Sequence, residues 1–418
     1  MTSGLGRTAI LLAAAVVSFS LPRAARGDFP GNAKFYGFLN AEVERAWASG
    51  GTTPYDARFR VTDGNSRLGF SGSIDIAEKT RAIWQIEASL NSFEQAGTSD
   101  KGLLSAISSR NTYVGVTDER FGTLTVGYVD SVYRSLVGSG SALGGNLGLT
   151  SFGLDLWNNT SAQMTGNTWS VFSRGEARFK NSVHYFSPEW FVRAGASYSV
   201  DENTATKRGR DRFSLAARVK WEGLQAGVGY DRQRNTGLNT DNMEQGLGAH
   251  TDAVDGASTW YVKAVAGFQF PTGTYVGAGW ERASYGIGQF VPADPNNPSS
   301  SIRDDTLTQD AVMGAVAQSF GDLSLMGSVG KLFKLKGASA VFGTDGQYEA
   351  FQYSLGAKYA LNQYFATYVY YTAIKNKEQQ DANLGQAPLY SNNLGASNAY
   401  LAPGDSPNAF GLGLIARW

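Results

Sequence analysis

The sequence predicts an all-β protein, a 16-stranded antiparallel transmembrane β-barrel. Three observations carry this prediction. From residue 33 onward apolar and polar residues alternate with a period of two, very short turns alternate with long connections, and the last alternating segment ends on an aromatic residue. A period of two is typical of strands. The regular change between short and long connections separates the two sides of an outer-membrane barrel, whereas a Greek-key sandwich gives no reason for it.

The first 27 residues have the pattern of a secretory signal peptide. Arg7 is the basic residue, residues 9 to 19 form the apolar core, and cleavage is expected after Ala25 or after Gly27. The apolar run is too short for a spanning helix, which needs about 20 residues. The expected organisation is a signal peptide at 1–27 and a single transmembrane β-barrel domain at 28–418.

Composition narrows the function classes. The chain has 418 residues with 42% hydrophobic, 17% charged and no Cys, so an exported form cannot depend on disulfides. Removing residues 1–27 deletes three arginines and no acid, which leaves 33 basic against 36 acidic residues, a net charge of −3. A near-neutral balance argues against nucleic acid, which requires a basic face. A lipid anchor would require a Cys, so a barrel is the remaining way to live in a membrane.

The alternation places apolar and polar residues on opposite strand faces. Leu68 and Phe70 share one face, while Arg67 and Ser71 share the other; in a spanning barrel the apolar face meets lipid and the polar face meets the lumen. The predicted strands are 33–48, 66–76, 80–91, 110–118, 122–131, 169–186, 190–200, 211–221, 224–233, 259–270, 273–284, 308–320, 323–333, 348–361, 364–375 and 409–418.

Short and long connections alternate along the chain. The short ones are 77–79, 119–121, 187–189, 222–223, 271–272, 321–322 and 362–363. The long ones are 49–65, 92–109, 132–168, 201–210, 234–258, 285–307, 334–347 and 376–408. This order puts all long loops on one side and both chain ends on the short-turn side. Structureless segments as long as 132–168 are usually functional or disordered.

Aromatic residues stand next to the short turns, where a membrane-interface girdle is expected. They are Trp190, Trp221, Phe270, Tyr364, Phe365 and Trp418. The last segment alternates from Phe410 to Trp418, the final residue. A strand that runs to the chain end is expected to pair with the first strand, so Phe410 and Trp418 are assigned to barrel closure and assembly.

At several of these segments the sequence resembles the trimeric general porins of Gram-negative outer membranes. The matching pieces are Phe35-Tyr36-Gly37, Ser66-Arg67-Leu68-Gly69-Phe70, Arg110-Asn111-Thr112-Tyr113-Val114-Gly115, Phe121-Gly122-Thr123-Leu124-Thr125-Val126-Gly127, Asn181-Ser182-Val183-His184-Tyr185 with Ser187-Pro188, and the aromatic C-terminus. Two features depart from the family: Trp418 replaces the usual Phe, and Leu143-Gly144-Gly145-Asn146 replaces an acidic Pro-Glu-Phe-Gly-Gly-like loop motif.

The resemblance implies a homotrimer of water-filled channels, each with a constricting third extracellular loop. That loop is 132–168 here, folded into the lumen. The expected function is passive diffusion of small hydrophilic solutes and ions across the outer membrane, without enzyme activity, cofactor or metal. A substrate-selective porin for a sugar or anion, and a plugged barrel acting as receptor or enzyme, are the alternatives. The expected partners are outer-membrane lipid and lipopolysaccharide, the barrel assembly machinery and the transported solutes.

Candidate constriction residues lie on the polar strand faces. Arg67, Arg110 and Arg178 each fall early in a strand that follows a long loop, so they are expected at similar height in the outer half of the lumen. Arginine stays charged, and acids on the loop would set a transverse field against these three. Asp155 is the first such candidate and Asp130 the second.

The lumen-facing positions carry more basic than acidic residues, so the pore is expected to be weakly cation-selective or even anion-preferring. The basic residues are Arg67, Arg110, Arg178, Lys180, Arg212, Arg218, Lys220 and Lys358, against Asp75 and Glu87. The chain has two histidines, His184 on a lumen-facing position and His250 in a long loop. Neither has a nucleophile motif beside it, so both are interpreted as hydrated residues.

Overall fold

The fold comes from a computed structural model that describes residues 32–51, 55–63, 66–90, 107–138, 171–202, 209–238, 251–286, 306–337, 345–384, 389 and 401–418. All strands belong to one antiparallel sheet. They are β1 (Asn32–Ser49), β2 (Arg58–Asp63), β3 (Arg67–Ala77), β4 (Thr80–Leu90), β5 (Ile107–Asp118), β6 (Gly122–Asp130), β7 (Arg178–Phe186), β8 (Val192–Ser199), β9 (Arg212–Trp221), β10 (Leu224–Leu238), β11 (Thr251–Gln269), β12 (Thr274–Gly286), β13 (Thr306–Phe320), β14 (Leu323–Leu332), β15 (Ala350–Ala360), β16 (Phe365–Asn376) and β17 (Ser406–Arg417).

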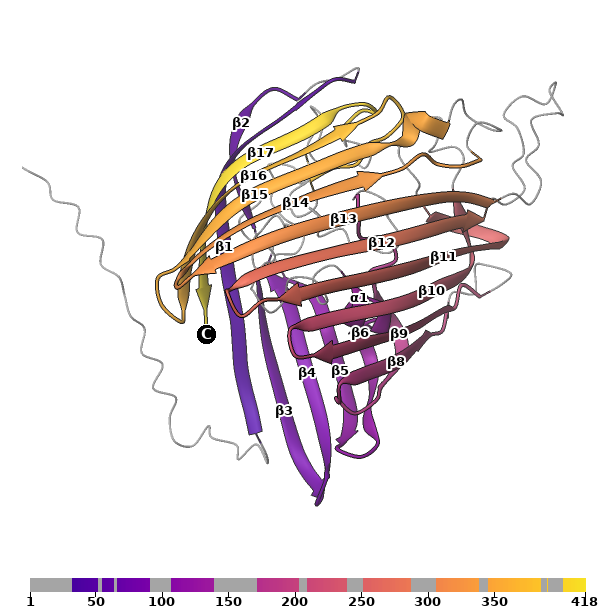
Figure 1. The fold of residues 1–418 in the computed structure, drawn as a ribbon. Coiled ribbons are helices and arrows are strands. Elements are labelled where there is room, and N and C mark those ends of the chain that lie inside the picture. The colour runs from indigo at the N-terminus through magenta and orange to yellow at the C-terminus, as the bar shows by residue number, and fades with distance from the viewer. Residues whose placement is uncertain are drawn as a thin grey trace, which may run out of the picture.

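The sheet closes on itself into a barrel (Figure 1). Successive strands pair with their neighbours, and β17 pairs with β1 from Phe38 opposite Arg417 to Ser49 opposite Ser406. The 17 strands form 16 barrel staves, because β2 and β3 pair one after the other with the same partner, β1. The predicted 16-stranded antiparallel barrel is confirmed, and so is its closure by the final strand.

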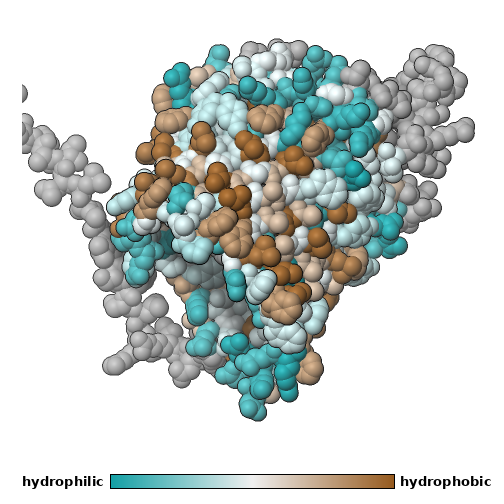
Figure 2. All heavy atoms as spheres, in the orientation of Figure 1, coloured by the Kyte–Doolittle hydropathy of each residue, from teal (hydrophilic) through white to brown (hydrophobic). Residues whose placement is uncertain are grey.

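The outer wall is apolar, as the alternation predicts. Along β3, Phe70 is 47% exposed and Ile76 58% exposed, whereas Gly69, on the opposite face of the strand, is buried. Figure 2 shows apolar side chains across the middle of the visible wall and hydrophilic ones gathered at its two margins. The apolar side chains of the outer wall are therefore placed where they can contact lipid.

The short turns lie at one rim of the barrel, along the left and lower margins of Figure 1, where the C-terminal end of β17 also lies. The aromatic residues assigned to a girdle at this rim are exposed: Trp190, Trp221, Phe270, Tyr364, Phe365 and Trp418. In the described residues, no helix is long and apolar enough to span a bilayer.

Two tyrosines of β16 bridge the closing seam, the pairing of β17 with β1, from the inside of the barrel. Each ring lies flat over a glycine of β17: a Cβ at Gly413 would run into the Tyr368 ring, and one at Gly411 into the Tyr370 ring. Crossing β17 in this way, the hydroxyl of Tyr368 reaches Asn40 on β1 at 2.7 Å. The absence of a side chain on these glycines is what lets the seam be bridged.

Carboxylates of β1 receive both hydroxyls. Tyr370 Oη donates to Glu44 at 2.6 Å, and Tyr368 Oη also donates to Glu42. A hydrogen bond to a charged group contributes more than a neutral one, about 1.5–3 kcal/mol. The same arrangement recurs where the Tyr36 ring of β1 covers Gly69 of β3 and its hydroxyl donates to Glu87 of β4 at 3.1 Å.

One predicted strand start is wrong. The segment expected at 169–186 becomes a strand only at Arg178, and residues 171–177 are irregular and almost wholly buried. They run inside the barrel and pack with α1 (Val132–Val137) against the inner faces of β9–β14.

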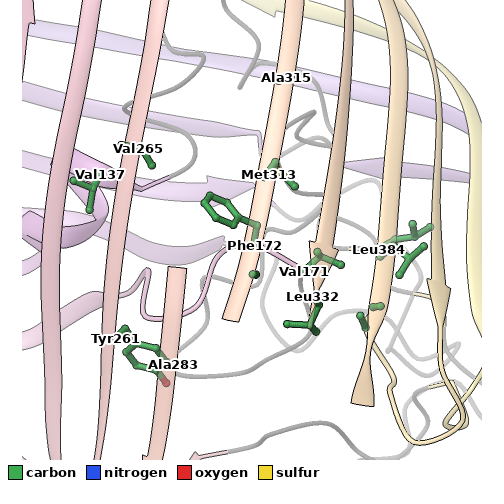
Figure 3. Close-up of a cluster of buried hydrophobic side chains, with 14 of the residues drawn as sticks. Val137, Val171, Phe172, Tyr261, Val265, Ala283, Met313, Ala315, Leu332 and Leu384 are labelled. Atoms are coloured by element: carbon green, nitrogen blue, oxygen red, sulfur yellow. The ribbon is translucent and has the colours of Figure 1, made fainter. Parts of the chain in front are cut away.

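An apolar core fills this side of the lumen. Figure 3 shows Val137, Phe172, Val265 and Met313 gathered there, from α1, the 171–177 segment, β11 and β13. Tyr348, in the 3-10 helix η6 (Asp345–Tyr348), and Leu384 after β16 belong to the same cluster. The alternation predicts a polar lumen wall all round, and on this side the wall is instead covered by packed protein.

Candidate functional site

The outgoing leg of the third long connection, residues 131–138, is bound to the inner wall through α1. Ser131 caps the helix, its Oγ accepting from the N–H of Arg134 at 3.1 Å. The N–H of Val132 donates to Ser197 Oγ of β8 at 2.9 Å, and that of Tyr133 to Ser214 Oγ of β9 at 3.1 Å. Wall hydroxyls thus satisfy N–H groups that lack partners in the first turn of any helix.

His184 belongs to this anchor and is not hydrated, contrary to the sequence interpretation, since its exposure is 0%. Its Nε2 lies 2.7 Å from Ser182 Oγ, and its Nδ1 lies 2.7 Å from Ser197 Oγ. Ser182 Oγ donates to the carbonyl of Gly127 at 2.8 Å. A neutral imidazole protonated on Nε2 satisfies every partner in this chain, so His184 braces the wall that holds α1.

The returning leg, residues 171–177, is held by charges. Arg174 Nη1 lies 3.1 Å from Glu281 Oε1 of β12, and Lys263 Nζ of β11 lies 3.0 Å from Glu281 Oε2. Lys263 also pairs with Glu176. All four side chains are at most 3% exposed. Lys263 and Glu281 are cross-strand partners in the wall, whereas Arg174 and Glu176 come from the returning leg.

Arg110 faces the lumen because of a β-bulge. The pairing of β4 and β5 shifts between Ile86 and Ala88, so two residues of β5, Arg110 and Asn111, stand opposite Glu87. A bulge re-aims a side chain in this way. Arg110 Nε lies 2.8 Å from Glu87 Oε1, and Nη1 donates to Ser89 Oγ at 3.1 Å. Strict alternation back from Val114 would have turned Arg110 outward.

Asp130 lies at the end of β6 and joins two arginines. Its Oδ1 is 2.9 Å from Arg178 Nε and 3.0 Å from Arg134 Nε, and its Oδ2 accepts from Asn111 Nδ2 at 2.9 Å. Asp130 was predicted as an acid on the loop that sets a field against the arginines, and it is instead the direct ion-pair partner of one of them, Arg178. Arg134 was missed by the sequence analysis, since nothing in the weakly patterned loop sequence marks a one-and-a-half-turn helix.

The arginines form one electrostatic group. Arg178 and Arg67 both interact with Arg110, and burial together with these two arginines lowers the pKa of Arg134, against the opposing effect of Asp130. A guanidinium stays charged despite such a shift. Arg67 lies with its Cζ 4.6 Å from the centroid of the Phe38 ring and has no ion-pair partner among the described residues. The predicted residue Asp155 lies outside the described residues.

We call Arg67, Arg110, Arg134 and Arg178 with Glu87 and Asp130 the arginine cluster. Its four cations and two carboxylates leave a surplus of two positive charges. Lys180, predicted in the lumen, is instead on the outer wall, where it lines a groove of 650 Å³ with Val126, Tyr128 and Val183. The bulge opposite Tyr128 in the β6–β7 pairing turns it outward.

Comparison with known proteins gives a family. Residues 11–379 match the family model of the Gram-negative porins. The major outer membrane protein P.IB of Neisseria meningitidis serogroup B is 27% identical over 234 residues, covering 54% of this chain and 61% of the relative. P.IB of Neisseria lactamica is 29% identical over 185 residues, covering 43% and 46%. The matched segment thus spans less than two thirds of these relatives' length.

Solved structures share the fold. An anion-selective porin from Comamonas acidovorans superposes with a TM-score of 0.65 at 17% identity, covering 93% of this chain and 100% of that one. The outer-membrane protein OmpT of Vibrio cholerae gives 0.57 at 17% identity, covering 93% and 98%. At these identities the likeness concerns architecture. Together with the match over most of the sequence and the closed apolar-walled barrel, it shows that this chain is an outer-membrane protein of the Gram-negative porin family.

Proposed function

We propose that the protein is a channel through which small hydrophilic solutes and ions diffuse passively across the outer membrane. The observation that carries this proposal is a wide closed barrel with charged side chains grouped on one part of its inner wall, around Arg110 and Arg178. A barrel of 16 staves leaves an aqueous lumen unless something fills it. Here the cluster of buried apolar side chains extends from β9 through β17 to β1, and the arginine cluster lies at α1 and the β3–β7 side.

The constriction is proposed at the arginine cluster, with Asp155 as a further acid. A local surplus of fixed positive charge raises the anion concentration in water around it. Fixed charges act over about 8 Å at physiological salt, so groups at the narrowest ring dominate selectivity. The pore is therefore expected to prefer anions weakly. A substrate-selective porin for a sugar or anion is the finer alternative, and solute-dependent block of the current would reveal it.

A planar bilayer holding purified protein tests the function and the constriction together. Wild-type protein should give ion conductance, and in a salt gradient its reversal potential should have the sign of anion preference. Replacing Arg67 and Arg110 with Ser should move that potential toward cations, and Asp155→Asn should move it toward anions. Absence of conductance would favour a plugged receptor. Conductance with no movement in either variant would place the constriction elsewhere.

The working form is proposed to be a homotrimer, giving conductance in three equal steps. Family membership supports this, as do small side chains on the outer wall, where Ala226, Ala264 and Ala278 lie together. Outer-membrane lipid, lipopolysaccharide and the barrel assembly machinery remain proposed partners. Native mass measurement in mild detergent should find three chains, and a monomer at several concentrations would contradict the trimer.

A further inference from the structure

Lys263 is the point at which both legs of the third long connection meet the barrel wall. Its ammonium lies 5.9 Å from the centroid of the Tyr133 ring, on the outgoing leg, and 4.4 Å from that of Phe172, on the returning leg. It also pairs with Glu176 of the returning leg. A cation over an aromatic face is attracted by the ring, and more strongly when water is excluded.

The ions around Lys263 form an alternating row in which no charge is left over. The order is Arg174, Glu281, Lys263 and Glu176, with 3.1 Å between the first pair and 3.0 Å between the second. Within this row only Lys263 and Glu281 belong to the wall. Buried ions tolerate little displacement, because moving one partner away strands the other in a poorly solvated site. The row therefore fixes where the returning leg lies.

The two legs are not fixed equally. The outgoing leg has one ion pair with the wall, Arg134 with Asp130 of β6, besides neutral hydrogen bonds to Ser197 and Ser214. Val137 also packs against glycines of β10. Hydrogen bonds to charged groups are stronger than neutral ones. Arg212 of β9 adds another charged contact to the returning leg, its Nη2 donating to the carbonyl of Gly175 at 3.0 Å. The most deeply buried charged contacts are thus those that the returning leg makes with β9, β11 and β12.

We propose that Lys263 is the positioning residue of the pore: its ammonium holds residues 131–138 and 171–177 together against the β9–β12 wall and so fixes the free cross-section beside the arginine cluster. This inference rests on the proposed channel function. Lys263 lies between two carboxylates in a row of ions without net charge, so its effect on permeation is through the position of the two legs.

Lys263→Met tests this directly, because it keeps an unbranched side chain and removes the charge. The variant should lose the single steady conductance level of the wild type and fluctuate between levels, with its ion selectivity less affected than its noise. Glu176→Gln, which removes the charge that Lys263 meets on the returning leg, should show the same change and covers the case in which Lys263→Met does not fold. Heat-modifiable mobility on gels reports folding of each barrel.

The matched control is Lys331→Met. Lys331 of β14 pairs with Glu349 at 2.6 Å, and no contact of this pair with 131–138 or 171–177 is found among the described residues. Its loss should leave the steady level unchanged. Steady wild-type-like conductance in both Lys263→Met and Glu176→Gln would overturn the inference while leaving the channel function intact. A wild type that does not conduct would instead overturn the proposed function.

A reversible tether separates position from charge. The chain has no native Cys, and a Cβ placed at Gly227 would lie 2.9 Å from Cγ1 of Val137. Val137→Cys with Gly227→Cys in the Lys263→Met background should recover a steady level when oxidised and lose it on reduction. If the oxidised disulfide forms and the current still fluctuates, Lys263 does not act by positioning these legs.

Discussion

Arg134 is the residue whose role depends most on its surroundings. It shares Asp130 with Arg178, so one carboxylate faces two guanidinium groups at 3.0 and 2.9 Å. Removing Arg134 leaves an intact Arg178–Asp130 pair and lowers the positive surplus of the arginine cluster by one. The site therefore allows one charge to be removed without stranding another.

Arg134→Gln is expected to shift the reversal potential toward cations. A unit charge about 4 Å from an ion is worth about 1 kcal/mol in water, which corresponds to about a fivefold change in local ion concentration and less with salt screening. The measurement is the reversal potential in a tenfold salt gradient, repeated at low and high ionic strength. Arg120→Gln, in the exposed turn after β5, is the control and should have no effect. An unchanged potential in Arg134→Gln would remove Arg134 from the ion path.

Asp405 gives a pH dependence. It precedes β17, is 0% exposed, and its carboxylate accepts no hydrogen bond from the residues that the structure describes. Burial, partly offset by the nearby backbone of Ala402, raises its pKa to about 6. Because the folded-state pKa is above the ordinary value, the folded form favours the protonated carboxyl. Stability should therefore be highest below about pH 4 and fall as pH rises to about 6.

Asp405→Asn should abolish this contribution. The variant is expected to be more stable than the wild type at pH 8, by up to about 3 kcal/mol, and close to it at pH 4. The midpoint temperature for loss of the heat-modifiable form, measured at both pH values, gives the comparison. The same difference at pH 4 and pH 8 would mean that Asp405 does not titrate in this range.

At the scale of elements, the tyrosine–glycine contacts link a strand to the second strand along the sheet, across the one between them. Tyr368 leaves β16, crosses Gly413 of β17 and ends at Asn40 and Glu42 of β1. The hydroxyls of Tyr368 and Tyr370 give the buried Glu42 and Glu44 donors that a water-filled lumen would otherwise supply. The seam is thus held by backbone pairing and by side chains that cross it.

Gly413→Ala should weaken the seam, because the added Cβ collides with the Tyr368 ring and displaces its hydroxyl. The expected loss is about 1.5–3 kcal/mol, the value of a hydrogen bond to a charged group. Gly314→Ala in β13 is the matched control, since a Cβ there has only one neighbour, 3.9 Å away. Urea midpoints of the two variants in detergent give the test. Equal midpoints would show that the ring can move without cost.

At the scale of the whole molecule, the chain end completes the barrel. The N–H of Trp418 donates to the carbonyl of Gly37, and the N–H of Gly37 donates to that of Trp418, both at 3.2 Å. The indole also lies 5.9 Å from the Phe35 ring. The final residue is therefore the last rung between β17 and β1, next to the short-turn rim.

Deleting Trp418 should leave unfolded protein in the periplasm, because the closing pair loses its last rung and the rim loses an aromatic. Trp418→Phe keeps both and should assemble normally. Outer-membrane levels and heat-modifiable mobility are the measurements. Normal values for the deletion would show that neither contact is needed for assembly.

Much of this architecture is local in origin. Alternation predicted the sixteen staves, because a strand between lipid and lumen changes polarity at every residue. The start at 169 was wrong, and β2 lies inside the predicted connection 49–65. Arg67, Arg110 and Arg178 lie on the alternate staves β3, β5 and β7, and Arg67 and Arg178 both interact electrostatically with Arg110. Arg110 faces the lumen because of a β-bulge, and no pattern in the sequence predicts that bulge. Its inward direction was predicted, but from strand alternation and not from the bulge.

The sequence alone determined the barrel, its strand order, its address and the basic character of one wall, because these follow from residue-by-residue contact with lipid, water and the chain end. Tertiary structure decided what fills the lumen. Contacts between residues far apart in sequence make 171–177 a buried segment and not a strand. Such contacts also pair Asp130 with Arg178 and place His184 in a hydrogen bond with Ser197 and out of water. Such contacts give no periodic pattern in the sequence, because each polar residue pairs with a distant partner and does not face solvent.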